Sequence, residues 1–311
     1  MVLLRSFETP RLYRGGYVSI GNFDGVHVGH RKIAERLRAL AEGDDVPAVV
    51  LTFEPHPLKL LRPEHVPPSL TTLEQKAELL EGGGATCVIA YPTDRKLLQL
   101  TPEEFFDAIL VAELRAKGIV EGPNFCFGKD RKGDIGALRD LCLRRGVVLD
   151  VVEPVGGETM ISSSTIRSLI DEGRMAEAVE LLGHPYRLRG EVVSGARRGQ
   201  MIGFPTANLA RIETLLPGDG VYGGIAAIGD RTFAAAINVG PNPTFGENNR
   251  KVEAHLIDFA GDLYGRSLDV DLIQRIRDTR RFESREELMR QIARDVAAAR
   301  ALLPVPTREQ T

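Results

Sequence analysis

The residues best suited to chemistry in the first half form a glycine-framed segment with two histidines three positions apart. The segment Gly21–His30 reads GNFDGVHVGH and lies between an expected strand and an expected helix. Gly25 and Gly29 allow a ligand to approach the backbone closely, and a helix N-terminus favours anions. The N–H groups of His27 and His30 could then neutralise charge on one phosphate group. The alternative is a tight turn in which the histidines are polar caps.

A run of hydroxyl residues suggests a second contact with phosphate. Residues Ile161–Arg167 follow an expected strand and begin an expected helix, with the arginine one turn beyond the serines. Hydroxyls and free N–H groups at a helix start, together with a guanidinium group, suit phosphate oxygens. A simple helix cap is the alternative interpretation.

The loop Gly122–Gly128 also follows an expected strand, and it contains one amide and two aromatic side chains. Asn124 could hold a flat ring by hydrogen bonding, while Phe125 and Phe127 stack on it. A packed loop is the alternative. The segment Glu54–Pro57 ends another expected strand, and ligands of parallel sheets gather at the carboxyl ends of strands.

In the second half, the segment Gly203–Asn208 reads GFPTAN. Thr206 and Asn208 are two positions apart, so in an extended segment they face the same side. A hydroxyl and an amide oxygen on one face can hold Mg²⁺ together with phosphate oxygens. Glu253 lies on an expected strand, where a carboxylate is most often solvated. For the GFPTAN segment the alternative is an ordinary turn.

The elements that would position these residues alternate between strand and helix in the first half. Strands are expected at 17–21, 48–53, 87–91, 118–121 and 147–152. A helix follows His30 with Ile33, Leu37 and Leu40 on one face, and Thr72 and Thr101 cap two further helices. This alternation predicts a parallel sheet with helices on both faces.

The second half is expected to be mostly strand. Strands are expected at 186–194, 221–228, 233–239, 252–259 and 268–276, punctuated by turn residues, which suggests a small antiparallel barrel. A helical stretch over 166–182 precedes them, and a closing helix begins at Ser284. Its apolar stripe is expected to be Leu288, Ile292, Val296, Ala299 and Leu303. The domain boundary is expected near 183–185.

Composition excludes several classes of protein. The 311 residues carry a formal net charge of −3, which argues against general attraction to nucleic acid or anionic lipid. The apolar stretches are too short to span a membrane. Three scattered cysteines do not form a disulfide framework, so a reducing cytoplasm is the expected location. The sequence leaves the oligomeric state open.

These motifs resemble a known family. The GNFDGVHVGH segment is similar to the HxGH signature of nucleotidyltransferases, and its surroundings resemble the prokaryotic bifunctional riboflavin kinase/FAD synthetase family from about Tyr17 to Leu303. The resemblance implies an α/β Rossmann-like nucleotidyltransferase domain at 1–183. A small antiparallel β-barrel riboflavin kinase domain with a C-terminal helix would occupy 184–311.

The resemblance also implies roles for individual residues of the first domain. His27 and His30 would contact the phosphates of ATP in the transition state, and Asn124, Phe125 and Phe127 would lie on the flavin side of the cleft. The nucleotide and its phosphates would lie against Gly21, Phe23, Asp24, Gly25, Gly29, Ser163, Ser164 and Arg167.

In the second domain, the resemblance implies that Thr206 and Asn208 hold Mg²⁺ and phosphate, with Gly203 at the nucleotide. Glu253 would be the general base for the 5′-hydroxyl of riboflavin. The chain departs from the family pattern at Cys126 and Gln200, where a basic residue is common, and in the serine run at Ser164.

The expected activity is therefore a two-step transferase. Riboflavin and Mg-ATP would give FMN, and FMN with a second ATP would give FAD and pyrophosphate, with Mg²⁺ as the cofactor. One alternative is a kinase with a weak adenylyltransferase. A flavin carrier or flavin-responsive regulator is a second. A flavin- or nicotinamide-dependent oxidoreductase is a third, disfavoured because a full GxGxxG with a downstream acid is missing after the first strand.

Overall fold

The computed structural model describes residues 1–7, 13–154, 161–195, 198–242, 244 and 247–302. The chain forms two compact units, Met1–Ser162 and Ser163–Thr311. Each unit is described by itself. Within the described residues, every helix is too short or too polar to cross a lipid bilayer.

The first unit is built on a six-stranded sheet in which all neighbouring strands are parallel. Its order is β1-β4-β3-β2-β5-β6. The strands are β1 (Val2–Leu4), β2 (Tyr17–Ile20), β3 (Ala48–Glu54), β4 (Cys87–Pro92), β5 (Gly118–Glu121) and β6 (Val148–Val151). The strand order reverses between β2 and β5, and the carboxyl ends of strands at such a switch point form the usual ligand crevice.

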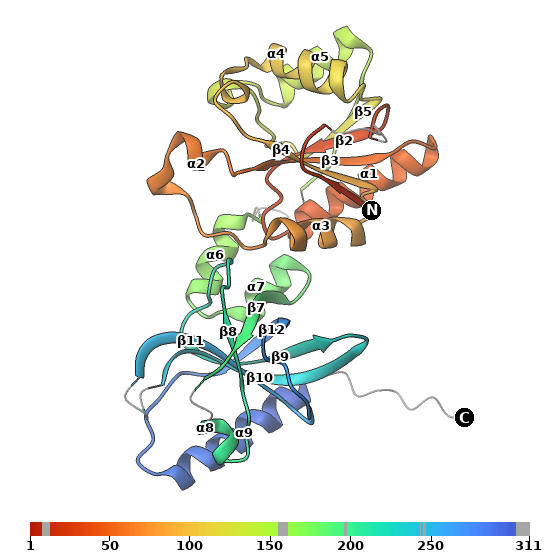
Figure 1. The fold of residues 1–311 in the computed structure, drawn as a ribbon. Coiled ribbons are helices and arrows are strands. Elements are labelled where there is room, and N and C mark those ends of the chain that lie inside the picture. The colour runs from red at the N-terminus through yellow and green to blue at the C-terminus, as the bar shows by residue number, and fades with distance from the viewer. Residues whose placement is uncertain (8–12, 155–160, 196–197, 243, 245–246, 303–311) are drawn as a thin grey trace, which may run out of the picture. The chain divides into compact units, whose positions relative to one another are not determined.

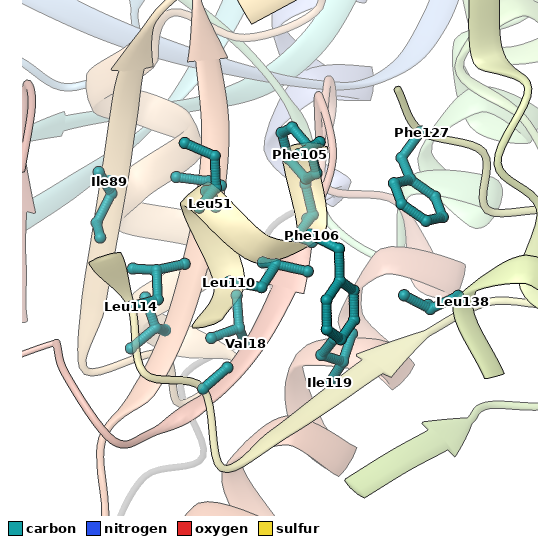
Figure 2. Close-up of a cluster of buried hydrophobic side chains, with 14 of the residues drawn as sticks. Val18, Leu51, Ile89, Phe105, Phe106, Leu110, Leu114, Ile119, Phe127 and Leu138 are labelled. Atoms are coloured by element: carbon teal, nitrogen blue, oxygen red, sulfur yellow. The ribbon is translucent and has the colours of Figure 1, made fainter. Parts of the chain in front are cut away.

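Helices cover both faces of this sheet, as the alternation of strand and helix predicted (Figure 1). One face packs against α1 (Val28–Gly43) and α3 (Leu73–Gly82), and the other against α4 (Pro102–Phe105), the π-helix η3 (Phe106–Glu113) and α5 (Ile135–Arg145). The remaining short elements are α2 (Leu58–Leu61), η1 (Pro63–His65), η2 (Leu97–Gln99) and η4 (Lys129–Arg131). Figure 2 shows the hydrophobic core on the face that α4, η3 and α5 cover. In it, Phe105, Phe106 and Leu110 lie over Val18 and Leu51.

Local sequence signals correctly located two helix starts in the first unit. Thr72 and Thr101 each form a reciprocal capping box, with Gln75 and Glu104 respectively, so two otherwise unpaired N–H groups are satisfied at each helix. The buried face of α1 is Ala34, Leu37 and Ala41, not the Ile33–Leu37–Leu40 stripe that the sequence suggested. Ile33 and Leu40 pack at the edge of that core, because the smaller alanines allow the helix to approach the sheet closely.

The second unit is a closed barrel in the order β10-β11-β8-β7-β12-β9, and every neighbouring pair is antiparallel. This confirms the predicted barrel. Its strands are β7 (Tyr186–Val193), β8 (Ala207–Ala210), β9 (Gly220–Ile228), β10 (Arg231–Asn242), β11 (Glu247–Leu256) and β12 (Ser267–Arg277). The helices of the unit are α6 (Ser163–Asp171), α7 (Met175–Leu182), α8 (Arg198–Met201) and α9 (Arg285–Ala301).

The predicted helical stretch over 166–182 is two helices, α6 and α7. The helical stretch is interrupted at Gly173, which has a φ of +74° that a residue with a side chain rarely adopts. Gly218 N–H donates to the Ile170 carbonyl at 2.9 Å, which ties the end of α6 to the loop before β9. The compact units thus divide before α6 and α7, whereas the boundary expected from the sequence lies after them at 183/184. That boundary stays a prediction.

The closing helix α9 begins after Ser284, as predicted, and packs on β9 and β10, but its buried stripe differs from expectation. Ala299 is fully buried with Ala234 and Ala236, while Leu288, Ile292 and Val296 are half-buried. Leu303 lies outside the described residues. The most buried polar residue of the helix is Asp295, whose carboxylate accepts from the Arg277 guanidinium at 2.8–3.0 Å. Charge pairing therefore anchors this helix together with apolar contact.

A buried carboxyl group lies at the switch point of the first unit. β2 pairs with β5 through Tyr17 and Val18, and beyond these residues Ile20 N–H donates to Glu121 Oε1 at 2.5 Å. The Ser19 hydroxyl donates to the same oxygen at 3.4 Å. Burial raises the pKa of Glu121 well above its usual range, although hydrogen bonds to its carboxylate oppose that shift. The Glu121 side chain therefore supports the end of β2 from within the core.

Replacing Glu121 with Gln should stabilise the protein progressively more as the pH rises from 5 to 8. The unfolded chain releases the Glu121 proton above pH 4.5, whereas the folded chain retains it, so wild-type stability falls with pH through this interval. An amide oxygen still accepts the Ile20 N–H and does not titrate. Thermal unfolding midpoints at pH 5 and pH 8 measure the difference, with exposed Glu35→Gln as the matched control. Equal effects of Glu121→Gln at both pH values would contradict this account.

Candidate functional site

The loop after β2 has a strained backbone. Phe23, Gly25 and Val26 all have positive φ, at +46°, +79° and +39°. For a β-branched residue such as Val26 this region is costly, so surrounding contacts must hold the loop in place. Gly21 lies against the Phe23 ring, because a Cβ at Gly21 would lie 3.2 Å from Phe23 Cε2. Such strain clusters at binding and catalytic sites.

The carboxylate of Asp24 supplies the main contacts that hold this loop. It accepts from Leu70 N at 3.0 Å, from Thr71 N at 3.1 Å and from the Thr71 hydroxyl at 3.2 Å. The Thr71 hydroxyl in turn accepts from Gly25 N at 3.2 Å. The loop is thereby fastened to the segment that leads into α3. Contact of Asp24 with a nucleotide, expected from the sequence, stays a prediction.

The two histidines meet at the start of α1, as their spacing suggested. Their rings stack with centroids 3.7 Å apart and planes 16° apart. His27 is the N-cap of the helix, and its Nδ1 accepts the His30 backbone N–H at 3.4 Å. A Cβ at Gly29 would lie 3.2 Å from His27 Cε1, so the glycine lets the imidazole lie over the helix start.

Burial keeps both imidazoles neutral near pH 7. It lowers the pKa of His27 to about 4 and the pKa of His30 well below its usual value. The charges of His27 and Lys76 lower the pKa of His30 further. Because His27 Nδ1 is a hydrogen-bond acceptor, the neutral ring carries its proton on Nε2 and can donate it. The Nδ1 atom of His30 is buried and has no hydrogen-bond partner among the described residues.

The residues predicted to hold the flavin follow β5. Asn124 is exposed and Phe125 is half-buried. Phe127 is only 6% exposed and stacks on Phe125 at 5.4 Å, and it also contacts Phe105. Phe127 thus behaves as the packed-loop alternative described, and a flavin contact for any of the three stays a prediction. Beyond the end of β3, His56 Nε2 lies 3.1 Å from Asn22 Nδ2.

The hydroxyl run lies in the other unit. Ser163 and Ser164 form the first turn of α6, and Arg167 follows one turn later, so the expected helix start is confirmed. These residues belong to the unit that contains the barrel, and His27 and His30 belong to the first unit. Their meeting at one triphosphate stays a prediction.

In the barrel, the strand register places three polar residues in one row. Glu253 on β11 is directly opposite Asn208 on β8 and Asn238 on β10. Directly opposed residues have Cβ atoms about 4.5–5.5 Å apart. The alternate positions Val252 and Ala254 are buried in the barrel, whereas Glu253 is half-buried on the outer face. The register therefore brings the predicted base beside the predicted ligand Asn208.

The loop before β8 lies against the same row. A Cβ at Gly195 would lie 2.8 Å from Asn208 Oδ1, and one at Gly199 would lie 3.5 Å from the Thr206 hydroxyl. His255 Nδ1 lies 2.7 Å from the Pro205 carbonyl, which fixes the segment ahead of Asn208. Gly203 has a φ of +86°, which its glycine permits. Both predicted ligands of Mg²⁺ thus face one glycine-containing loop.

These residues fit Mg²⁺ by their chemistry. Thr206 and Asn208 offer a hydroxyl and an amide oxygen, and Mg²⁺ prefers oxygen ligands together with water and phosphate. In the described part of the chain, no three His, Cys, Asp or Glu residues are grouped to hold a metal by themselves. A Mg²⁺ bound here would therefore depend on phosphate oxygens for part of its coordination.

Sequence patterns did not single out two buried ionisable residues of the first unit, Lys76 and Glu121. Lys76 lies three positions after Leu73, on the apolar stripe of α3. A lysine on an apolar stripe is unusual, and this could have identified it from the sequence. Glu121 ends a buried strand and offered no signal beyond being a carboxylate at a strand terminus.

Comparison with known proteins gives matches in both units. The FAD synthetase family matches residues 10–166, and the riboflavin kinase family matches residues 182–303. A bifunctional riboflavin kinase/FMN adenylyltransferase from Escherichia coli (strain K12) is 37% identical over 288 residues, covering 92% of each chain. The protein of the same name from Pseudomonas fluorescens is 37% identical over 305 residues, covering 97% of this chain and 98% of its own.

A solved structure is similar over nearly the whole chain. It is described as a macrolide-efflux protein from Streptococcus pneumoniae, with a TM-score of 0.85 and 32% identity. The match covers 96% of this chain and 98% of that one. The likeness extends across both units, as do the matches to the bacterial proteins above.

Lowering the pH from 7 to 5 should destabilise the first unit through His27. Its pKa is lowered from 6.5 to about 4 on folding, so its contribution is complete above pH 6.5 and is lost as the pH falls toward 4. The loss at pH 5 is about 2 kcal/mol. His27→Asn keeps an N-cap acceptor but cannot titrate, so denaturant unfolding of this variant should have a shallower pH dependence. An identical dependence in both proteins would contradict the neutral buried imidazole.

Proposed function

Because the chain belongs to the bifunctional riboflavin kinase/FMN adenylyltransferase family, we propose that it makes FAD from riboflavin in two ATP-dependent steps. The single observation that carries the proposal is that each half of the chain matches a different one of the two families. We also propose a domain boundary at 183/184, which lies two residues inside the start of the second matched range, 182–303, and a cytoplasmic location.

In the kinase step, the 5′-hydroxyl oxygen of riboflavin attacks the γ-phosphorus of ATP. The bond from that phosphorus to its bridging oxygen breaks, and ADP leaves. Glu253 accepts the hydroxyl proton, and its place beside Asn208 supports this role. Thr206 and Asn208 would hold Mg²⁺, which neutralises charge on the phosphates.

In the adenylyl-transfer step, a phosphate oxygen of FMN attacks the α-phosphorus of a second ATP. The bond to the β-phosphate breaks, and pyrophosphate leaves with the electron pair. His27 and His30 would each donate one N–H to the phosphate oxygens as charge accumulates there. Their neutral state supports hydrogen-bond donation and excludes a role as paired cations near pH 7. No covalent intermediate is needed, so positioning and charge neutralisation supply the rate.

The test is a time course of riboflavin with excess Mg-ATP, followed by separation of FMN and FAD. We expect FMN to form first and FAD to follow. FMN without FAD would identify a kinase with a weak adenylyltransferase. Bound flavin without either product would identify the carrier or regulator, and flavin that cycles between oxidised and reduced forms would identify the oxidoreductase.

Replacing Glu253 with Gln should lower riboflavin phosphorylation by about 10²- to 10⁴-fold, because the amide cannot accept the hydroxyl proton. Conversion of added FMN to FAD should continue, since Glu253 is assigned no role in that step. Both rates are measured on the same preparation, and flavin binding is checked separately. An unchanged rate of FMN formation would remove Glu253 from its assigned role.

Replacing Gly195 with Ala should raise the KM for Mg-ATP in the kinase step by roughly tenfold or more. The added methyl group meets the Asn208 side-chain amide, most closely at its nitrogen, so the whole amide would have to move from its position. Gly43→Ala is the matched control, because a Cβ at Gly43 meets no atom within 4 Å. Steady-state kinetics of FMN formation compares the two variants. If they behave alike, the Gly195 contact does not position Asn208.

A further inference from the structure

A buried lysine lies beside the two histidines and is not explained by the packing of its helix. Lys76 is in the first turn of α3, and only 8% of its surface is exposed. Within the described residues, its ammonium group has one hydrogen-bond acceptor, the Thr52 hydroxyl at 3.3 Å. An ammonium group has three N–H donors, so two of them lack a protein partner.

The position of Lys76 is unfavourable for a cation in three ways. Burial removes water from the charge, and the same burial lowers the pKa of the ammonium group. The first turn of a helix is the positive end of its dipole, which disfavours a further positive charge. No carboxylate among the described residues forms an ion pair with it. Residues that break local rules in this way are expected at functional sites.

Among the contacts of the described residues, neither neighbouring carboxylate forms an ion pair with Lys76. Asp24 and Glu54 are near enough to raise the pKa of Lys76. Both oxygens of Asp24, however, accept from Leu70 N, and one also accepts from Thr71. Glu54 is exposed to water at the end of β3. These two carboxylates therefore offset the charge of Lys76 only from a distance, without a hydrogen bond to its ammonium group.

The contacts around Lys76 place its ammonium group beside the loop that carries His27 and His30. Asp24 fastens the loop to residues 70 and 71, and Thr72 caps α3 directly after them, which fixes the first turn of α3 beside the loop. The Thr52 hydroxyl that accepts from Lys76 donates to the Asn22 carbonyl at 3.3 Å. The lysine charge also reaches His30, since it lowers the pKa of that imidazole.

We propose that the ammonium group of Lys76 binds a phosphate group of the adenylyl-transfer reaction, next to His30. The proposal rests on the proposed function of the first unit. Two neutral imidazoles can donate hydrogen bonds but supply no positive charge, and a buried ammonium group supplies it where water is excluded. The phosphate could belong to the triphosphate of ATP or to FMN. Both present the same anionic oxygens, so the experiment has an arm for each.

The test compares full-length wild type with Lys76→Met, Lys76→Arg and Thr52→Val. Calorimetric titration with inorganic pyrophosphate and with FMN measures binding without turnover, and FAD formation from FMN gives kcat and KM. Lys76→Met should weaken binding of the ligand whose phosphate contacts Lys76 by roughly 10- to 100-fold. Lys76→Arg should retain most of the affinity. Exposed Lys96→Met is the matched control and should match wild type.

The two ligand arms identify the source of the phosphate. Weaker pyrophosphate binding in Lys76→Met with unchanged FMN binding assigns the lysine to the ATP phosphates. The reverse pattern assigns it to the FMN phosphate. Unchanged binding of both ligands, with unchanged kcat/KM for FAD formation, would overturn the proposal.

Thr52→Val separates phosphate binding from support of the loop. If Lys76 only holds the Asn22 carbonyl through Thr52, removing the hydroxyl should reproduce the full loss seen in Lys76→Met, and that result would overturn the proposal. A phosphate-binding lysine predicts a smaller loss in Thr52→Val, because the ammonium group remains.

The pH dependence of FAD formation would not change if Lys76 had only a structural role. This measurement compares wild type with Lys76→Arg, so it applies even if Lys76→Met fails to fold. Wild-type kcat/KM for FAD formation should fall on the alkaline side as Lys76 loses its proton below its usual pKa. The other titratable groups that interact with the charge of Lys76 are Asp24, Glu54 and His30. Lys76→Arg should extend activity to higher pH, and coincident profiles would overturn the proposal.

Failure of the proposed function is distinguishable from failure of this inference. Wild type that forms no FAD refutes the adenylyltransferase activity, whatever the variants do. Wild type that forms FAD, with a Lys76→Met variant of equal activity and equal ligand binding, refutes only the role of Lys76. Riboflavin phosphorylation is measured in every preparation, and its retention shows that the second unit of each variant is folded.

Discussion

The carboxylate of Asp24 is the contact on which the first unit's site depends. The loop around it has three residues with positive φ, and such a backbone persists only where other contacts hold it. Asp24 holds it by accepting N–H and hydroxyl groups from residues 70 and 71. The same contact sets the end of the loop, where His27 caps α1, and the start of α3, where Lys76 lies. One side chain therefore positions both the neutral donors and the buried charge.

In the second unit, the equivalent constraint is strand register. Glu253 stands beside Asn208 because β11 and β8 pair antiparallel in one alignment, and a slip of one residue would turn Glu253 into the barrel and Val252 outward. The burial of Val252 and Ala254 makes that slip costly. The apolar core of the barrel thus maintains the arrangement of the polar residues on its outer face.

The two sites handle charge differently. The barrel site keeps the Glu253 carboxylate half-buried and pairs its position on β11 with Asn208 on β8. The first unit buries its imidazoles and keeps them neutral. Phosphoryl transfer to a hydroxyl requires a proton acceptor, whereas attack by a phosphate that is already ionised requires charge neutralisation. The contrast in burial agrees with this division.

Much of the fold followed from local patterns. Alternating strands and helices predicted the parallel sheet, the strand-rich second half predicted the barrel, and Thr72 and Thr101 marked helix starts that the structure confirms. The short edge strand β1 and the four-residue β8 were missed, since neither contains enough residues for a periodic signal. Gly173 divided a stretch whose apolar periodicity continues on both sides.

The sequence by itself determined which chemical groups are present and which helix starts and strand ends carry them, because periodicity, capping and turn preferences act over a few residues. Only the tertiary structure decided that Asp24 holds a loop, that Lys76 is buried without an ion pair among the described residues, and that Glu253 stands between Asn208 and Asn238. Burial and strand pairing join residues far apart in the chain, so the pKa of a side chain and the identity of its neighbours are set by packing that no local pattern contains.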